Sequence, residues 1–176
     1  MIWALFVLLA LIYSILIYNR LVFSRNIAST AWVSIDINIK LRNDLIPLIV
    51  SIVKQYSSYE KNTLKELAEL RANLESSDSV KKKALINQKI TESMNNFFIV
   101  AENYPKLMAN KSFLRLQNEL STLESNIAFK RQFYNDAVFK YNTIIMSFPS
   151  SIVAKIFGFK VKESFSDDSK YLGVKL

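Results

Sequence analysis

The sequence predicts an all-α protein in which an N-terminal transmembrane helix precedes an up-and-down four-helix bundle. The 176 residues include only 2 glycines and 3 prolines, which is too few turn formers for a sandwich or barrel of many short strands. Apolar residues recur at steps of three and four along most of the chain, as they do on one face of a helix. Residues 2–18 carry no charged side chain. Long helices joined by short polar breaks satisfy all three observations.

The composition excludes several classes of chemistry. The chain has no cysteine and no histidine, so it cannot build a disulfide, a cysteine nucleophile, a Ser-His-Asp triad or an ordinary zinc site. A di-iron site in a helical bundle would also need Glu-x-x-His pairs. Both glycines lie after residue 157, outside any glycine-rich phosphate loop. We therefore expect no enzymatic activity, no catalytic residue, no cofactor and no metal.

Residues 1–20 are predicted to be the membrane anchor. The uncharged stretch 2–18 would rise about 25 Å as a helix, and Leu21, Val22 and Phe23 can extend it toward the roughly 30 Å hydrocarbon core. A cleaved signal peptide is one alternative, but only Met1 precedes the stretch and no basic segment leads into it. The core helix of a soluble domain is the other alternative.

The positive charges predict both the orientation and the lipid contact. Arg20 and Arg25 follow the span and no basic side chain precedes it, so the positive-inside rule places the N-terminus outside and the following domain in the cytoplasm.

The net charge of +8 would suit nucleic acid, for example through Lys81, Lys82 and Lys83, but the basic residues are dispersed and no groove-reading motif is present. We expect the lipid bilayer as a partner and no nucleic acid.

Residues 18–74 are predicted to be helical, with one complication at Pro47. A proline inside a helix donates no N–H and crowds the carbonyl four residues earlier. Asp44 could cap a new helix, so we predict a split near 43–45, with a single helix kinked at Pro47 as the alternative.

The later breaks are polar or contain proline. The break at 75–78 predicts a helix that starts at Ser79 with Asp78 as its cap, interrupted on its apolar face by Asn87 and ended or bent by Pro105. Residues 111–147 repeat apolar positions every 3.5 residues, as in a coiled coil. We expect Phe129, Phe133 and Phe139 to widen that stripe, so that the helix packs against several neighbours. Pro149 is predicted to stop this helix, and Gly158 to stop the short apolar segment 150–159 that follows.

The polar residues within these stripes occur in a recognisable order. The pattern comprises Tyr18-Asn19, Arg25, Trp32, Asp36, Lys40-x-Arg42-x-Asp44, Pro47, Lys54-x-Tyr56, Tyr104-Pro105, Glu119, Glu124, Arg131-x-x-Tyr134-Asn135 and Tyr141-Asn142. In type and spacing it resembles the LemA family, from the anchor to about Phe165. The chain departs from the family's usual residues at Leu41, Leu48 and Tyr59.

The resemblance implies a bacterial inner membrane protein with one anchor and a bromodomain-like helical bundle in the cytoplasm. It implies three parts: an anchor at 1–20, a bundle at 21–149 and a tail at 150–176 that packs on the bundle or the membrane. The family has no established catalytic activity and is similar to adaptor or structural proteins of the envelope. Some relatives are connected to magnetosome formation, and others occur beside membrane metalloproteases or TPM-domain proteins.

Several groups of candidate residues allow both a structural and a functional interpretation. Asp36, Lys40, Arg42 and Asp44 form either a recognition patch or a salt-bridged helix end with a cap. Asn135 and Asn142 lie on one face beside Tyr134 and Tyr141, where their amides would fix helix register or bind a ligand. The tail around Lys155, Lys160 and Lys162 would be a lid on the bundle or a second membrane contact.

The function favoured by these observations is a membrane-tethered helical scaffold or adaptor. Its expected partner is an unknown membrane or cytoplasmic protein, or a second copy of the chain. The alternative is an accessory or regulatory subunit of a membrane metalloprotease or TPM-domain protein. A ligand-sensing bundle is a third possibility, disfavoured because nothing that resembles an output domain follows the bundle.

Overall fold

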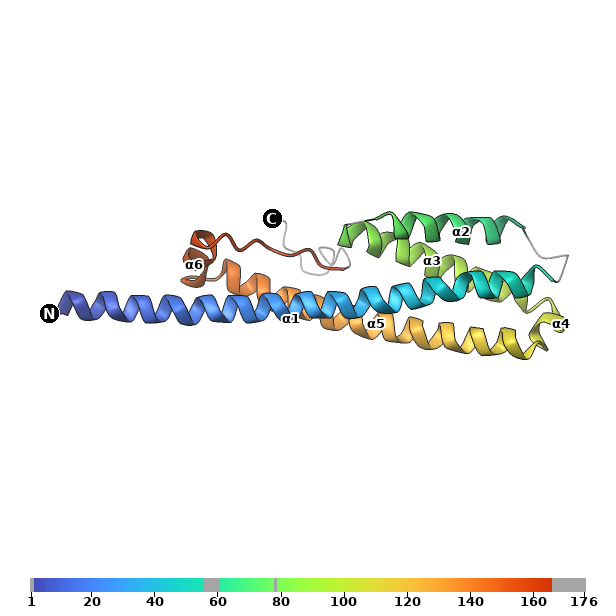
Figure 1. Ribbon diagram of the computed structural model, residues 1–176, viewed down its shortest axis with the longest axis horizontal. Helices are drawn as coiled ribbons and strands as arrows, with labels where there is room; N and C mark the ends of the chain where they lie inside the picture. Colours follow the sequence, from blue (N-terminus) through green and yellow to red (C-terminus); the bar gives the residue numbers. More distant parts are fainter. Residues whose placement is uncertain (1, 56–60, 78, 166–176) are drawn as a thin grey trace. The chain divides into compact units, whose positions relative to one another are not determined.

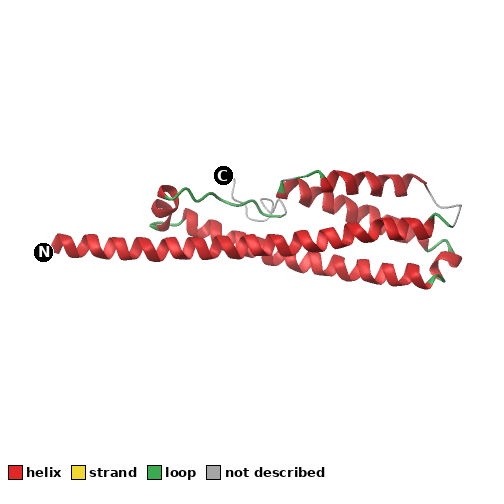
Figure 2. Cartoon of the chain, viewed as in Figure 1, coloured by secondary structure: helices red, strands yellow, loops and turns green. Residues whose placement is uncertain are grey.

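A computed structural model of the chain describes residues 2–55, 61–77 and 79–165 (Figure 1). Every regular element in these ranges is a helix, as predicted (Figure 2). The helices are α1 (Ile2–Val53), α2 (Lys61–Glu75), α3 (Val80–Ala101), α4 (Pro105–Met108), α5 (Lys111–Met146) and α6 (Ser150–Ile156). The predictions that concern Tyr56, Tyr59, Asp78 and Ser166–Ser169 lie outside the described residues.

The chain divides into two compact units. The first unit combines Met1–Val33 with Gln132–Ser164, and the second combines Ser34–Arg131 with the chain from Phe165 on. The long helices α1 and α5 each contribute to both units. Each unit has its own buried residues and is described by itself below.

Helix α1 begins with the stretch that is apolar enough to cross a membrane. Among the described residues it is the one helix with that length and composition, and almost none of its apolar window is buried. A core helix of a soluble domain would be mostly buried, so that alternative is disfavoured. The predicted N-terminal apolar helix is therefore present.

The predicted split near 43–45 is wrong, because α1 continues through Pro47 to Val53. Pro47 is exposed, whereas Ile46 and Ile49 are buried. The proline ring thus lies on the solvent side of the helix, and burial of the two isoleucines offsets the local cost of the missing hydrogen bond. Asp44 is an exposed residue inside the helix rather than its cap.

In the second unit, α2 packs along α3 (Figure 1). Phe97 of α3 lies 5.4 Å from Phe98 and 6.4 Å from Phe113 of α5, measured between ring centroids. The core of this unit is aliphatic around these rings, and its buried members include Ile35, Ile39, Ile46, Ile49, Val53, Leu67, Leu74, Ile90, Met94, Leu120 and Ile127.

The connections of the second unit follow local rules. Ser79 is the N-cap residue of α3, one residue later than the predicted cap. Pro105 occupies the first turn of the short helix α4, where its missing N–H matters little. Asn110 caps α5, because its Oδ1 accepts hydrogen bonds from the backbone N–H groups of Ser112 and Phe113 at 2.9 and 3.2 Å.

The first unit is built around the meeting of α1 with α6. Ile17 and Leu21 of α1 are buried together with Val153 and Ala154 of α6. Helix α6 then ends as predicted at Gly158, whose φ of 69° is the left-handed conformation that favours glycine. The N–H of Phe159 donates to the carbonyl of Ala154 at 2.9 Å, which closes a Schellman motif.

The repeat along α5 is confirmed over most of the helix. Its buried positions are Phe113, Leu120, Ile127, Tyr134, Val138 and Tyr141. The expectation for the additional phenylalanines is wrong. Phe129, Phe133 and Phe139 are 73%, 54% and 59% exposed, because they lie away from the buried stripe. Within the described chain α5 therefore buries a narrower face than its aromatic content suggests.

Candidate functional site

Arg42 is the centre of a buried polar cluster in the second unit. Its side chain projects from α1 and is wholly buried. The guanidinium donates to the Oδ1 atom of Asn87 at 2.7 Å and to the hydroxyl of Thr91 at 3.0 Å, both on α3. It also forms an ion pair with the carboxylate of Glu124 on α5. The cluster therefore joins three helices.

Burial and pairing act on Arg42 in opposite directions. Removal from water lowers the pKa of its guanidinium, and the negative charge and hydrogen bond of Glu124 offset part of that change. Thr91 strengthens the arrangement, since its hydroxyl lies 3.1 to 3.2 Å from both oxygens of Glu124. Such a cluster specifies how α1, α3 and α5 pair, because any other register would leave a buried cation without its anion.

Asp36 forms a second, more exposed ion-pair site. Its carboxylate lies 3.1 Å from Lys40, the predicted i, i+4 partner, and 2.7 Å from Lys83 on α3. Burial alone would raise the pKa of Asp36, but the hydrogen bonds and charges of the two lysines outweigh it, and the pKa lies below its ordinary value. Of the two readings given for the charged run, recognition patch or salt bridge, the geometry favours the salt bridge.

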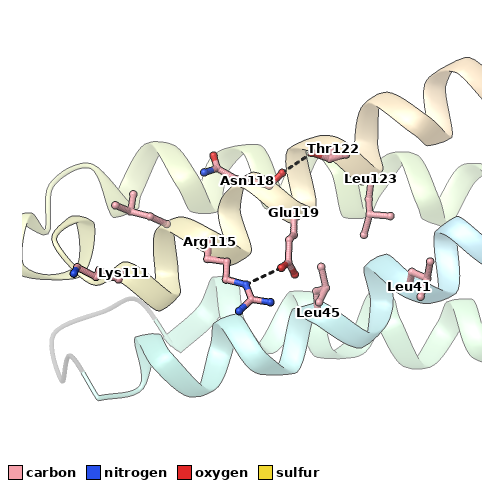
Figure 3. Close-up of a pocket in the computed structure, with 9 residues that line it drawn as sticks. Leu41, Leu45, Lys111, Arg115, Asn118, Glu119, Thr122 and Leu123 are labelled. Carbon is pink, nitrogen blue, oxygen red and sulfur yellow. Dashed lines mark hydrogen bonds and ion pairs between the residues drawn. The ribbon is translucent and has the colours of Figure 1, made fainter.

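An open groove of about 750 Å³ lies in the second unit between α1 and α5 (Figure 3). Arg115 donates to the carboxylate of Glu119 at 3.0 Å along one side of it. The groove is lined by four leucines, Leu41, Leu45, Leu114 and Leu123, and by the polar residues Lys111, Arg115, Asn118, Glu119 and Thr122. Apolar contact area bordered by charge is typical of a surface that binds a partner.

The polar face of α5 in the first unit binds the extended chain that follows α6. Asn142 donates from Nδ2 to the carbonyl of Lys162 and accepts from the N–H of the same residue, both at 2.9 Å. The hydroxyl of Tyr134 donates to the carbonyl of Glu163 at 2.7 Å, and that of Tyr141 to the carbonyl of Lys160 at 3.1 Å. We call residues 159–164 the strap. Of the two asparagines predicted to fix helix register or bind a ligand, Asn142 holds the strap, together with Tyr134 and Tyr141.

The environment of Tyr134 and Tyr141 agrees with their role as hydrogen-bond donors to the strap. Burial, followed by the negative charge of Glu163, raises the pKa of Tyr134 to about 12. Burial also raises the pKa of Tyr141, against a smaller opposing influence of Arg25. Both hydroxyls therefore stay protonated as donors to the strap.

Aromatic and cationic residues of the family pattern lie around the strap and the residues next to it. Trp32 lies 5.7 Å from Tyr134 between ring centroids, and Tyr18 lies 5.7 Å from Phe159. The guanidinium carbon of Arg25 lies 5.4 Å from the ring centre of Phe159. In the second unit, Arg131 lies 4.8 Å from the ring centre of Phe165.

The remaining predicted residues are not gathered at one site. Asn19, Asp44, Pro47 and Pro105 are exposed, and Tyr104 and Asn135 are half-buried. Glu119 pairs with Arg115, while Glu124 pairs with Arg42, so the two glutamates act separately. Among the described residues no group of three acidic side chains is placed to hold a metal ion.

Sequence reasoning missed the partners of Arg42 and most of the groove. Thr91 gave no signal, since it is an ordinary polar residue on the side of a helix. Asn87 did give one, because it interrupts the apolar stripe of α3 and is buried. A buried amide inside a stripe needs a partner, and an arginine on a neighbouring helix could have been sought.

Over the residues that the structure describes, the protein is all-helical, and one helix, at the N-terminus, is apolar enough to cross a membrane. The model of the LemA family matches residues 31–171, which is more than half of the chain, and the protein therefore belongs to the LemA family. The chain is also similar to the magnetosome proteins MamQ 1 and MamQ 2 of Paramagnetospirillum magneticum, with 31% identity over 75 residues. That stretch spans 43% of this chain and 28% of each relative.

Proposed function

We propose that this LemA-family protein is a non-enzymatic, single-pass scaffold of the bacterial inner membrane, with its N-terminus outside and its second unit in the cytoplasm. In this proposal α1, α2, α3 and α5 form an up-and-down four-helix bundle in the second unit. Arg20 and Arg25 after the apolar stretch support the orientation. The lack of cysteine and histidine supports a role other than catalysis.

The groove between α1 and α5 is the observation that carries the proposal. The apolar lining extends along α1 on both sides of Leu41. Ile37, Leu41 and Leu48 are each about half exposed and follow one another at helical spacing over about 16 Å. An apolar stripe of that length suits a helix of a partner better than a compact small molecule, which needs an enclosed cleft. The occupant is therefore an amphipathic partner helix.

The charges beside the groove define that helix further. Lys111 and Arg115 line it together with Glu119, so the positive charges exceed the negative one. A partner helix with an apolar face and acidic flanks matches this arrangement, because opposite charges at the border of an interface favour the correct pairing. The names of the relatives connect them to the magnetosome, and no such role is taken over for this chain.

The experiment is site-specific photocrosslinking from Leu41 in the full-length protein in intact membranes. We expect an adduct that is lost with Leu114→Asp and whose crosslinked peptide maps to an amphipathic helix. Glu69 on α2 is the matched control position, since it is exposed and lies outside the groove. Equal adducts from Leu41 and Glu69, or adducts that survive Leu114→Asp, contradict the groove as the binding site.

The identity of the adduct separates the alternatives. A reproducible metalloprotease subunit or TPM-domain protein would support an accessory subunit, and a second copy of this chain would support self-association.

A further inference from the structure

Helix α6 presents an apolar surface that nothing in the described chain covers. Its inner face packs on α1 through Val153 and Ala154. Its outer face carries Ile152 and Ile156, four residues apart, and Ile156 is 72% exposed. The turn before α6 adds Phe148, which is 82% exposed. Such a cluster on a seven-residue helix requires an explanation.

The position of α6 along α1 supplies that explanation. Its inner face contacts Ile17 and Leu21, at the end of the uncharged stretch 2–18. That stretch rises about 25 Å, which is shorter than the roughly 30 Å hydrocarbon core of a bilayer. Residues up to Leu21 must therefore lie at or within the hydrocarbon boundary if the span crosses. Helix α6 lies at the same level.

The charges near α6 match the headgroups of anionic lipids. Residues 137–162 contain Lys140, Lys155, Lys160 and Lys162 and no acidic residue. Lys155 lies beside Ile152 and Ile156 on the helix, where its long side chain can keep the ammonium group in the headgroup layer. Basic groups beside an apolar face are typical of helices that lie in the membrane interface.

Several polar groups of this region are already hydrogen-bonded inside the protein. The hydroxyl of Ser147 donates to the carbonyl of Thr143 at 2.7 Å, and that of Ser150 donates to the carbonyls of Ile144 and Ser147. The N–H groups of Ser151 and Phe157 donate to backbone carbonyls at 2.8 and 3.1 Å. Backbone that enters hydrocarbon must meet this condition, since no water is present there.

Aromatic contacts fix α6 to α1 at this level. The ring of Tyr18 lies 4.9 Å from that of Phe157 and 5.7 Å from that of Phe159. Tyrosine is common at the boundary between headgroups and hydrocarbon, which agrees with the level deduced from the length of the span.

We propose that α6 and the turn before it are inserted into the anionic bilayer beside α1 as a second, non-spanning membrane contact. Ile152, Ile156 and Phe148 enter the acyl region, and the lysines lie among the lipid phosphates. This inference rests on the proposed membrane span and goes beyond it, because a single span by itself assigns no lipid contact to α6.

The test uses the absence of cysteine from the chain, which makes single-cysteine variants unambiguous. An environment-sensitive fluorophore is attached to Ile156→Cys in the full-length protein, reconstituted in vesicles of phosphatidylcholine and phosphatidylglycerol. We expect quenching by nitroxide-labelled lipid and protection from aqueous iodide. Phe129→Cys, an exposed phenylalanine of the second unit, should show the reverse, and Leu9→Cys within the apolar stretch should behave like Ile156→Cys.

The outcomes separate this inference from the membrane span on which it rests. Lipid quenching at Leu9 with iodide quenching at Ile156 would overturn the insertion of α6 and leave the span intact. Protection of Ile156 from both quenchers would mean that protein covers α6, and would also overturn it. Iodide quenching at Leu9 would reject the span itself.

A second variant tests the apolar contact directly. Ile152→Asp should abolish lipid quenching of the probe at Ile156 and leave the helical circular dichroism unchanged, since Ile152 is exposed. Lipid quenching that persists in this variant would contradict an insertion driven by the outer face of α6.

Discussion

At the scale of single residues, Arg42 combines the most burial with the most specific set of partners. Its guanidinium is bound by an amide, a hydroxyl and a carboxylate from two other helices. The Nε atom of the same side chain has no partner in the structure. The cluster therefore specifies a pairing of helices more than it adds net stability, because desolvation of the cation offsets much of the attraction.

Glu124→Gln should destabilise the second unit by about 1 to 3 kcal/mol, because the buried cation loses its anion. The effect is smaller than for a wholly buried pair, since the side chain of Glu124 is 30% exposed. The free energy of unfolding can be measured by circular dichroism on the full-length protein in detergent micelles.

Glu119→Gln is the matched control, since its pair with Arg115 is exposed and should change stability by under about 0.5 kcal/mol. Arg42→Met combined with Glu124→Gln should cost less than Glu124→Gln alone, because no buried charge remains. Equal losses for Glu124→Gln and Glu119→Gln would argue against a buried charge at Arg42.

At the scale of elements, α5 performs two tasks along one helix. Its first half contributes Phe113, Leu120 and Ile127 to an apolar core. Its second half uses Tyr134, Tyr141 and Asn142 to hold the strap through hydrogen bonds. A continuous heptad pattern therefore covers two different kinds of packing.

Asn142→Leu should release the strap while preserving the helices. The substitution removes two hydrogen bonds and leaves the N–H and carbonyl of Lys162 without their partner, at a cost of about 1 to 3 kcal/mol. Limited proteolysis within 159–164 should become several-fold faster, with unchanged far-ultraviolet circular dichroism.

Asn126→Leu provides the comparison, since Asn126 is an exposed residue of the same helix. Equal proteolysis of the two variants would indicate that the strap is held by its apolar contacts rather than by Asn142.

The elements that sequence predicted correctly are those governed by local chemistry. The ends of α5 follow from a long apolar repeat and from proline at 149, and the end of α6 follows from Gly158. The continuity of α1 through Pro47 was predicted only as the alternative to a split, because the sequence does not show that burial of Ile46 and Ile49 outweighs the local cost of proline. The partners of Arg42 were missed because Asn87 and Glu124 are distant in sequence, and a helical wheel does not show which faces meet.

At the scale of the whole molecule, the proposed membrane span would determine on which side of the membrane the second unit works. Both the groove and the Arg42 cluster belong to that unit, so their possible partners depend on which side of the membrane it occupies. The positive-inside rule predicts the cytoplasmic side, because translocation of basic residues near a span is disfavoured.

Cysteine accessibility in spheroplasts tests this orientation. Glu69→Cys should react with a membrane-impermeant maleimide only after the inner membrane is permeabilised. Ile2→Cys, at the opposite end of the span, should react in intact spheroplasts. Immediate labelling of Glu69→Cys and protection of Ile2→Cys would reverse the orientation, and recovery of the protein in the soluble fraction would reject the anchor.

The strap has a consequence for sequence variation within the family. Helix α5 binds the carbonyls of residues 160, 162 and 163, which every amino acid supplies, and the N–H of residue 162, which every amino acid except proline supplies. The hydrogen bonds that hold the strap therefore do not need these side chains, and proteolysis within 159–164 should be unchanged by nearly any replacement of Lys162 apart from proline, which lacks the N–H. The charge of residues 160–163 can therefore vary in evolution while the strap stays bound to α5.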